Sequence, residues 1–413
     1  CKENVEVVKL LLARDDIDVT AHSSREERNG FHAVCVAGNS EIVKLLLARE
    51  DVDINKKDKN GNTPFHLACK EGKIEIAKLL LAKDELDINA KDCDGGNTAF
   101  YYACDSRTFK IAEMLISRKD FDVNATSNGV NPLHFAIREK HWKIAKLLIG
   151  RVDLDINAKT KGEQTAFYAA SQNVESCTVE IMKMLIARDD FDVNQKIMNG
   201  GTVFQLACAL ERNCEIVKML FNKDGIDINE MNGQGKTAFH NACQKGHVEI
   251  VKLLMSRNDL DINAKSNDGN SALHFGYTLN NGSYIIYQTC YSRQAERLNW
   301  ETRSEIIKLL LSRDDLDINV KNNKFKTVLH YACKEGRAEI VKLLIGRDDL
   351  DINATTIEDN TAFHCACGRG YVEIAKLLMS RSDLDINAKN ELGQTALQCA
   401  CERGQACIAE LLG

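Results

Sequence analysis

A short ending, Asp-Ile-Asn or a close variant, recurs along the whole chain and constrains the fold more than any other feature. Its last residue falls at Thr20, Asn55, Asn89, Asn124, Asn157, Asn194, Asn229, Asn263, Asn319, Asn353 and Asn387. Nine of the ten intervals lie within two residues of 35, and the tenth equals one period plus 22 residues. Spacing of this regularity and length is typical of a chain built from stacked structural units.

The unit at residues 57–89 shows what each repeat is expected to form. The Asp-Lys-Asn-Gly segment at 58–61 predicts a tight turn, because glycine readily supplies the positive φ that such a turn needs. Thr63-Pro64 then predicts an N-cap and the first residue of a short helix that runs through Cys69. Crowded apolar residues predict a second helix over 74–81. Two such short helices cannot bury their own apolar faces, so each pair must pack on its neighbours.

This unit resembles the ankyrin repeat. The family's Thr-Pro-Leu-His signature is present, with some variation, as Thr63-Pro64-Phe65-His66, Asn131-Pro132-Leu133-His134, Thr237-Ala238-Phe239-His240, Ser271-Ala272-Leu273-His274, Thr327-Val328-Leu329-His330 and Thr361-Ala362-Phe363-His364. The resemblance covers essentially the whole chain. It implies an all-α ankyrin-repeat solenoid of helix-turn-helix and hairpin-loop units, about 34 residues each, forming an elongated, curved superhelix.

Some units depart from the signature. Tyr101, Tyr168, Gln205 and Gln398 stand where the family has histidine, and the first hairpin, around residues 22–29, is irregular. We expect these units to pack less regularly than the others.

The domain organisation follows from the same repeat. The chain has only two prolines and no linker-like segment, which favours a single array over residues 1–413. Residues 1–19 form a partial repeat, about eleven units follow, and the last is truncated. An insertion at 276–304 lies within the eighth unit. Both end helices have apolar outer faces where a terminal repeat is normally polar, which predicts that the native protein continues in both directions.

Composition excludes several classes of function. Hydrophobic residues make up 44% and charged residues 28%, as in folded, soluble chains. The formal net charge of −6 argues against nucleic acid as the main partner. No apolar run is long enough for direct membrane insertion, and no signal-peptide pattern opens the chain. We therefore expect an intracellular, cytoplasmic protein.

The sixteen cysteines are not interpreted as disulfides or metal ligands, and the recurring ones are interpreted as core residues. Eight of them share one repeat position, where the family usually has a small apolar residue: Cys35, Cys69, Cys104, Cys208, Cys243, Cys333, Cys367 and Cys401. Free cysteine packs as a small hydrophobe, and this usage suits a reducing compartment. The pairs Cys365 with Cys367 and Cys399 with Cys401 are spaced two apart on a helix, where side chains diverge. A zinc site is therefore not expected.

Histidine and glycine patterns give no sign of catalysis or of a cofactor. Seven of the ten histidines occupy the signature position, and such periodicity favours a structural role in which each ring hydrogen-bonds a turn of its own or a neighbouring unit. No recurring nucleophile accompanies them. Gly235-Lys236-Thr237 resembles the end of a phosphate-binding loop, but Glu230 stands where that motif needs glycine. We expect no catalytic residue, no metal and no cofactor.

Two further periodic features lie between the units. A basic residue followed by acidic ones, as in Arg188-Asp189-Asp190, closes each second helix and predicts a solvated rim of weak ion pairs; the alternative is an acidic row that attracts a basic partner.

The asparagine of Asp-Ile-Asn is expected to hold the loop between units through side-chain-to-backbone hydrogen bonds. The resemblance also implies that matching asparagines are candidates for hydroxylation: Asn55, Asn89, Asn157, Asn263, Asn353 and Asn387.

The insertion is rich in aromatic residues, namely Tyr277, Tyr284, Tyr287, Tyr291 and Trp300. Tyrosine and tryptophan are common interface anchors, so the segment could bind a partner. It could equally extend the two helices and pack its rings on the array, and the sequence leaves both readings open.

The resemblance implies a recognition surface made of the hairpin tips and the inner face of the first helices. By position, its exposed or half-exposed candidates are Lys59, Asn62, Lys70, Glu71, Tyr102, Phe135, Arg138, Tyr331, Lys334 and Arg369. The leading hypothesis is a non-catalytic scaffold that binds one or more proteins, extended ones included, along a concave surface. The alternatives are an adaptor arm for cytoskeletal or membrane proteins, and the substrate-recruiting region of an enzyme whose catalytic domain lies outside this chain. The sequence carries no indication of oligomeric state.

Overall fold

A computed structural model describes residues 2–12, 14, 17–23, 25–105, 109–173, 175–197, 200–210, 214–277 and 300–412. Within these residues the regular elements are 23 helices, with no strand. The chain divides into two compact units, Cys1–Asp192 and Val193–Gly413. Among the described helices, none has the length and apolar character needed to cross a bilayer.

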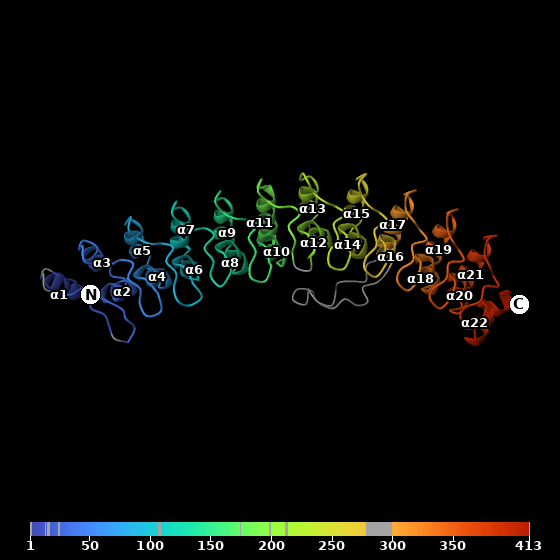
Figure 1. Ribbon diagram of the computed structural model, residues 1–413, viewed down its shortest axis with the longest axis horizontal. Coiled ribbons are helices and arrows are strands. Elements are labelled where there is room, and N and C mark those ends of the chain that lie inside the picture. Colours follow the sequence, from blue (N-terminus) through green and yellow to red (C-terminus); the bar gives the residue numbers. More distant parts are fainter. Residues whose placement is uncertain are drawn as a thin grey trace. The chain divides into compact units, whose positions relative to one another are not determined.

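The first unit opens with a single helix and continues as five helix pairs. These elements are α1 (Lys2–Leu12), α2 (Gly30–Ala37) with α3 (Ser40–Leu46), α4 (Pro64–Lys70) with α5 (Ile74–Leu81), α6 (Ala99–Asp105) with α7 (Lys110–Ile116), α8 (Pro132–Arg138) with α9 (Trp142–Ile149), and α10 (Ala166–Ser171) with α11 (Ser176–Ala187). We call the even-numbered member of each pair its first helix. First helices pack on first helices of the adjacent pair, and second helices do the same, so that each kind forms one row (Figure 1).

The second unit repeats this arrangement with six pairs. They are α12 (Val203–Ala209) with α13 (Cys214–Phe221), α14 (Ala238–Lys245) with α15 (Val248–Met255), α16 (Ala272–Tyr277) with α17 (Trp300–Leu311), α18 (Val328–Lys334) with α19 (Ala338–Ile345), α20 (Ala362–Cys367) with α21 (Val372–Met379), and α22 (Ala396–Glu402) with α23 (Ala406–Leu412). Within this unit too, helices pack on their own partner and on the adjacent pair. The all-α repeat solenoid expected from the sequence is confirmed.

The start of α4 shows why each first helix begins where it does. The Thr63 Oγ1 accepts a hydrogen bond from the backbone N–H of His66 (3.3 Å), and the His66 Nδ1 accepts one from the N–H of Thr63 (3.1 Å). Pro64 takes the first helical position, where its missing N–H is not needed. The preceding turn closes at Gly61 with a φ of +77°. The predicted cap, turn and helix pair of this unit are therefore confirmed.

Each signature histidine also joins its pair to the next one. The His66 Nε2 donates to the backbone carbonyl of Asn97, in the hairpin of the following pair (3.3 Å). The same bond to the residue before the next cap is made by His32, His134, His274, His330 and His364, whereas His240 bonds the carbonyl of Ala264, earlier in the following segment. Burial lowers the pKa of these rings, to about 4 for His134, His240, His274 and His330. The predicted structural role of the histidines is confirmed.

The departures from histidine keep much of this bonding. In the pair that carries Gln205, the amide Oε1 accepts from the N–H of Thr202 (3.0 Å) and Nε2 donates to the carbonyl of Lys236 (3.1 Å). The hydroxyl of Tyr101 donates to the carbonyl of Val130 in the next hairpin (2.6 Å). The expected irregularity is not seen in these bonds, because an amide or a phenol can also reach the neighbouring carbonyl.

The asparagine that closes each repeat clamps the loop that follows. In Asn319, Nδ2 donates to the carbonyl of Asp349 (2.6 Å) and Oδ1 accepts from the N–H of Asp351 (2.8 Å). The same two bonds are made by Asn55, Asn89, Asn124, Asn157, Asn194, Asn229, Asn263 and Asn353. The predicted side-chain-to-backbone ties between units are confirmed.

The basic residue at the end of each second helix does more than the predicted weak rim pairing. Arg347 forms a two-point ion pair with Asp349 (2.8 Å for each bond). Its Nη1 also donates to the carbonyls of Leu311 and Arg313 at the end of the preceding second helix. Such carbonyls have no partner within their own helix, so the guanidinium caps them. A solvated rim is therefore an incomplete description, since these arginines also join adjacent pairs.

The cysteines at the shared repeat position lie in the core, with one exception. Seven of the eight are buried. Cys401 is exposed, because no first helix follows α22 in the described structure to cover it. All cysteines within the described ranges are free thiols.

Candidate functional site

The structure places most of the predicted recognition residues on accessible surface. Lys59 is exposed on a hairpin tip, and the exposed residues at or just beyond the ends of first helices are Lys70, Glu71, Arg138, Lys334 and Arg369. Tyr102, Phe135 and Tyr331 are half-buried on the first helices α6, α8 and α18. These residues share one type of surface within each unit, formed by the hairpins and the exposed side of the first helices, which we call the first-helix face.

Two of the predicted recognition residues are buried, so the prediction that they are exposed is wrong. Asn62 is only 8% exposed, because it lies in the hairpin arm, where its N–H bonds the Asp58 carboxylate and its carbonyl accepts from His32. Tyr277 is 2% exposed and ends α16; its hydroxyl donates to the carbonyl of Tyr331 (2.9 Å). Tyr277 therefore follows the packing alternative for the inserted segment.

The structure does not describe the contacts of the other aromatic candidates in the insertion. Tyr284, Tyr287 and Tyr291 lie outside the described residues, and Trp300 is described only as the first residue of α17.

Charged residues on the first-helix face of the first unit have partners close by. The Lys70 ammonium lies 5.5 Å from the ring centroid of Tyr102, whose hydroxyl donates to the Asp92 carboxylate (2.5 Å). Arg138 lies over the Phe135 ring at 5.5 Å and pairs with the Glu139 carboxylate (2.9 Å). Much of the charge on this face is thus balanced internally.

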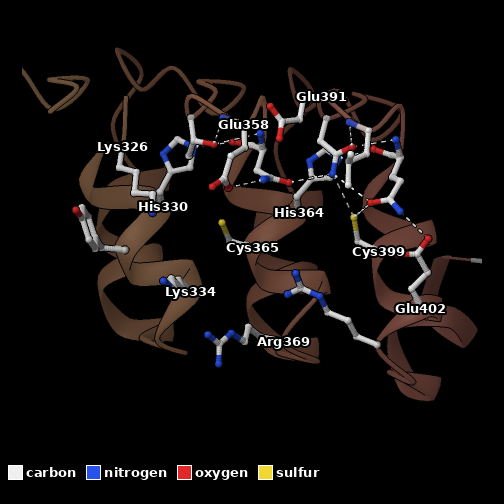
Figure 2. A pocket seen from close by; sticks show the side chains of 17 residues that line it. Lys326, His330, Lys334, Glu358, His364, Cys365, Arg369, Glu391, Cys399 and Glu402 are labelled. Atoms are coloured by element: carbon white, nitrogen blue, oxygen red, sulfur yellow. Dashed lines mark hydrogen bonds between the residues drawn. The ribbon is translucent and has the colours of Figure 1, made fainter. Parts of the chain in front are cut away.

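The second unit contains a groove of about 470 Å³ on its first-helix face. It runs across α18, α20 and α22 and the hairpins that precede them, and we call it the first-helix groove (Figure 2). Its lining residues are Lys326, His330, Tyr331, Lys334, Thr356, Glu358, Asn360, His364, Cys365, Arg369, Asn390, Glu391, Leu392, Gln394, Cys399, Glu402 and Arg403. Three predicted candidates, Tyr331, Lys334 and Arg369, come together here.

A polar network fixes the hairpin side of the groove. The Nε2 of His330 donates to the Asn360 carbonyl (3.1 Å), and that of His364 to the Gln394 carbonyl (3.0 Å). The Asn390 amide joins the last two hairpins by donating to the Asn360 Oδ1 (3.2 Å). Because these groups are satisfied by one another, they shape the groove and leave recognition to the other side chains.

Charge is distributed unequally between the two sides of the groove. Figure 2 shows Glu358 and Glu391 on the hairpin side, Lys334 and Arg369 toward the far ends of the helices, and the Cys365 sulfur between them. Within the described part of the chain, none of these four charged residues forms an ion pair. Burial raises the pKa of the Cys365 thiol, so this group is neutral at physiological pH.

Sequence reasoning missed several groove residues, among them Lys326, Glu358, Glu391 and Leu392. They lie on hairpins, at positions close to that of Lys59 in an earlier repeat. Their place in the hairpin, shortly before the cap residue of each first helix, is the signal in the sequence that marks them.

Three consecutive hairpins of the second unit also carry an exposed apolar residue at the tip. These residues are Phe325, Ile357 and Leu392, which are 52%, 65% and 73% exposed. Phe325 has a φ of 56°, a left-handed conformation that a bulky side chain rarely adopts. Large apolar side chains in such positions cost stability, which favours a role in binding.

The described residues contain no group of three or more His, Cys, Asp or Glu side chains arranged to hold a metal ion. The histidines instead bond backbone groups, as shown above for His66. What the first-helix face offers is a set of charged, aromatic and apolar side chains on a rigid frame.

Comparison with known families agrees with this architecture. The family model for ankyrin repeats in three copies matches residues 1–92, 87–160, 298–356 and 350–413, and that for ankyrin repeats in many copies matches 205–255. The chain belongs to the ankyrin repeat family. Ankyrin repeats are generally protein–protein interaction modules and are typically non-catalytic, but the fold does not specify the partner. No curated protein matches this ankyrin repeat chain.

Proposed function

We propose that this ankyrin repeat protein is a non-catalytic scaffold that binds protein partners through its hairpin tips and first-helix faces. One observation carries the proposal: the residues that repeat hold the helix pairs together, whereas the exposed residues differ from pair to pair. The repeated histidines, asparagines and arginines are occupied by bonds to adjacent pairs. The first-helix face is therefore free to vary without loss of the fold.

The variation on this face is chemical as well as steric. The residue after the signature position is half-buried in some pairs, as Tyr102, Phe135, Asn241, Tyr331 or Cys365, and buried in others, as Leu67, Leu206, Phe275 or Cys399. The half-buried side chains present part of their surface to a partner while the frame holds them in place. A row of such positions, spaced by one helix pair, suits an extended partner or several partners.

The state of the titratable groups supports a non-catalytic role. The rings of His240 and His330 have a pKa of about 4 because they are buried, so they remain neutral and hydrogen-bonded near pH 7. Burial also raises the pKa of the core thiols, for example that of Cys35 to about 12, and a protonated thiol is a poor nucleophile. The free thiols also suit a reducing, intracellular compartment.

Site-specific photo-crosslinking of the full chain tests the proposal. A benzophenone amino acid replaces Tyr331 on the first-helix face or, as the control, Lys376 on the second helix α21 of the same unit, which is also exposed. We expect discrete protein adducts from the Tyr331 position and few from the Lys376 position. Equal labelling at both positions, or adducts only at Lys376, would contradict the proposal.

A further inference from the structure

We propose that the first-helix groove binds an extended peptide segment with an aspartate or glutamate at every third residue. The inference deepens the scaffold function proposed above and rests on it. It commits to a class of partner and to a site: carboxylates of the peptide meet Lys334, Arg369 and Arg403, which are exposed side chains at or just after the C-terminal ends of α18, α20 and α22.

The first argument is that these three cations lack carboxylate partners. Within the described residues, Lys334, Arg369 and Arg403 form no ion pair, although each lines the groove. In the first unit Arg138, at the repeat position of Lys334, is paired with Glu139 and stacked on Phe135. A row of cations without such partners attracts an anionic ligand.

The second argument is that the Arg403 side chain reaches the end of the preceding first helix, α20. The Arg403 side chain lies against Gly368, the residue before Arg369; a methyl group on Gly368 would be 3.1 Å from the Arg403 Nη1. Glycine at this position thus leaves room for a guanidinium from the following pair.

The third argument concerns spacing. Packed helices lie about 10 Å apart, so Arg369 and Arg403, which share one repeat position, recur at about that interval, and Lys334 lies one residue earlier on its own helix. A polyproline-II-like chain has three residues per turn and rises about 3.1 Å per residue, so that every third side chain lies on one face about 9 Å apart. The dimensions favour an extended segment.

The fourth argument concerns which side of the groove the acidic side chains of the peptide face. Glu358 and Glu391 lie on the hairpin side of the groove, opposite Lys334 and Arg369 (Figure 2). They repel carboxylates from the hairpins and so direct the acidic face of the peptide toward the helix ends. Leu392 adds an exposed apolar contact near the hairpin tips. Lys326 on the hairpin side and Glu402 at the end of α22 reduce the charge difference between the two sides. The helix ends still carry three cations, Lys334, Arg369 and Arg403, against that one carboxylate.

The test uses the full chain and three fluorescent nine-residue peptides of equal length. The probe has aspartate at positions 1, 4 and 7 in a Gly/Ser background, the second has asparagine at those positions, and the third has aspartate at 1, 3 and 5. We expect the first to bind at least about tenfold more tightly than the other two, with affinity that falls as salt is raised. No binding of the first peptide, or equal affinity of all three, would overturn the inference.

Charge-removing variants locate the site. We expect Arg369→Gln and Arg403→Gln each to weaken binding of the first peptide about tenfold, with partial recovery in Arg369→Lys, because each removes a charge-assisted hydrogen bond. The matched controls are Lys376→Gln and Lys342→Gln, two exposed lysines on α21 and α19, the second helices of the pairs that carry Arg369 and Lys334. Both are expected to leave affinity unchanged, and all variants should keep the circular dichroism spectrum of the parent.

The results separate this inference from the scaffold function. Unchanged affinity in Arg369→Gln and Arg403→Gln would overturn the groove assignment. If adducts persist at Tyr331 in the crosslinking experiment while the aspartate peptide fails to bind, the scaffold function stands and the acidic-peptide inference falls. Loss of both would remove the proposed function itself.

Discussion

Phe325 holds a backbone conformation that glycine holds in equivalent hairpins. Its φ is 56°, whereas Gly235, Gly269 and Gly393 have values of 70°, 73° and 72°. A side chain in this region costs about 1 kcal/mol relative to glycine. We therefore expect Phe325→Gly to raise the free energy of unfolding of the second unit by about 1 kcal/mol. Urea denaturation followed by circular dichroism would measure the change.

The opposite substitution serves as its control. Gly393 has open space around the position of a Cβ atom, so Gly393→Ala introduces the backbone cost without a clash, and about 1 kcal/mol of destabilisation is expected. If Phe325→Gly instead destabilises the protein, the Phe325 side chain contributes packing that outweighs its backbone strain.

His330 allows the structural role of the signature histidine to be measured. Its Nδ1 accepts from the Thr327 N–H (3.2 Å) and its Nε2 donates to the Asn360 carbonyl (3.1 Å). We expect His330→Ala to lower the free energy of unfolding by about 3 kcal/mol, since it leaves buried polar groups unpaired and a cavity behind. His330→Gln should cost less than about 1 kcal/mol, because Gln205 makes both kinds of bond in its own pair. Equal losses in chemical denaturation would show that ring packing dominates.

The roles of individual residues could be predicted from the sequence where the same residue type recurs at a fixed spacing. The histidines and the Asp-Ile-Asn asparagines recur at fixed spacing, so a shared structural role could be predicted for each set. The exposure of Asn62 and Tyr277 could not, because both are set by neighbouring segments: Asn62 is covered within its hairpin arm, and Tyr277 packs against Tyr331 of the next pair. A residue that does not recur in other repeats cannot be compared with equivalents, so its environment could not be predicted in this way.

Between elements, the clamp made by Asn319 is the simplest connection to test. Its amide bonds both the Asp349 carbonyl and the Asp351 N–H of the next loop. We expect Asn319→Ala to cost about 2 kcal/mol, since two hydrogen bonds are lost together. Hydrogen exchange should become faster at the Asp351 amide while amides inside α18 remain protected. Uniform loss of protection across the pair would instead mean that the loop and the helices open as one unit.

The helices themselves were predictable from caps, turns and apolar spacing, as the α4–α5 pair shows. The reach of Arg347 to the carbonyls of Leu311 and Arg313 was not, because it depends on how adjacent second helices are placed in three dimensions. The same limit applied to the groove. Lys334 and Arg369 were named individually, but their position opposite Glu358 and Glu391 required the packed structure.

At the scale of the whole molecule, the buried histidines predict how stability depends on pH. The pKa of His134, His240, His274 and His330 is about 4 in the folded chain and about 6.5 in an unfolded one. Between these values the unfolded chain binds protons that the folded chain excludes, so the free energy of unfolding falls as the pH is lowered. The contribution is complete above pH 6.5 and is lost progressively toward pH 4, by up to about 1.4 kcal/mol per pH unit for each ring.

Urea denaturation at pH 7.5, 6 and 5 would measure this dependence, with each unit followed separately because repeat arrays need not unfold in one step. His330→Gln should reduce the pH slope of the second unit by one proton. A midpoint that does not change between pH 7.5 and 5 would contradict the low pKa values.

The bonds from histidine, asparagine and arginine all join a helix pair to its immediate neighbour within each unit. Under mechanical tension, a pair can therefore detach while the pairs beyond its neighbour keep their own connections. Each such event would release about 34 residues, or roughly 110 Å of chain. A molecule built in this way lengthens stepwise under load and recoils when the load is removed.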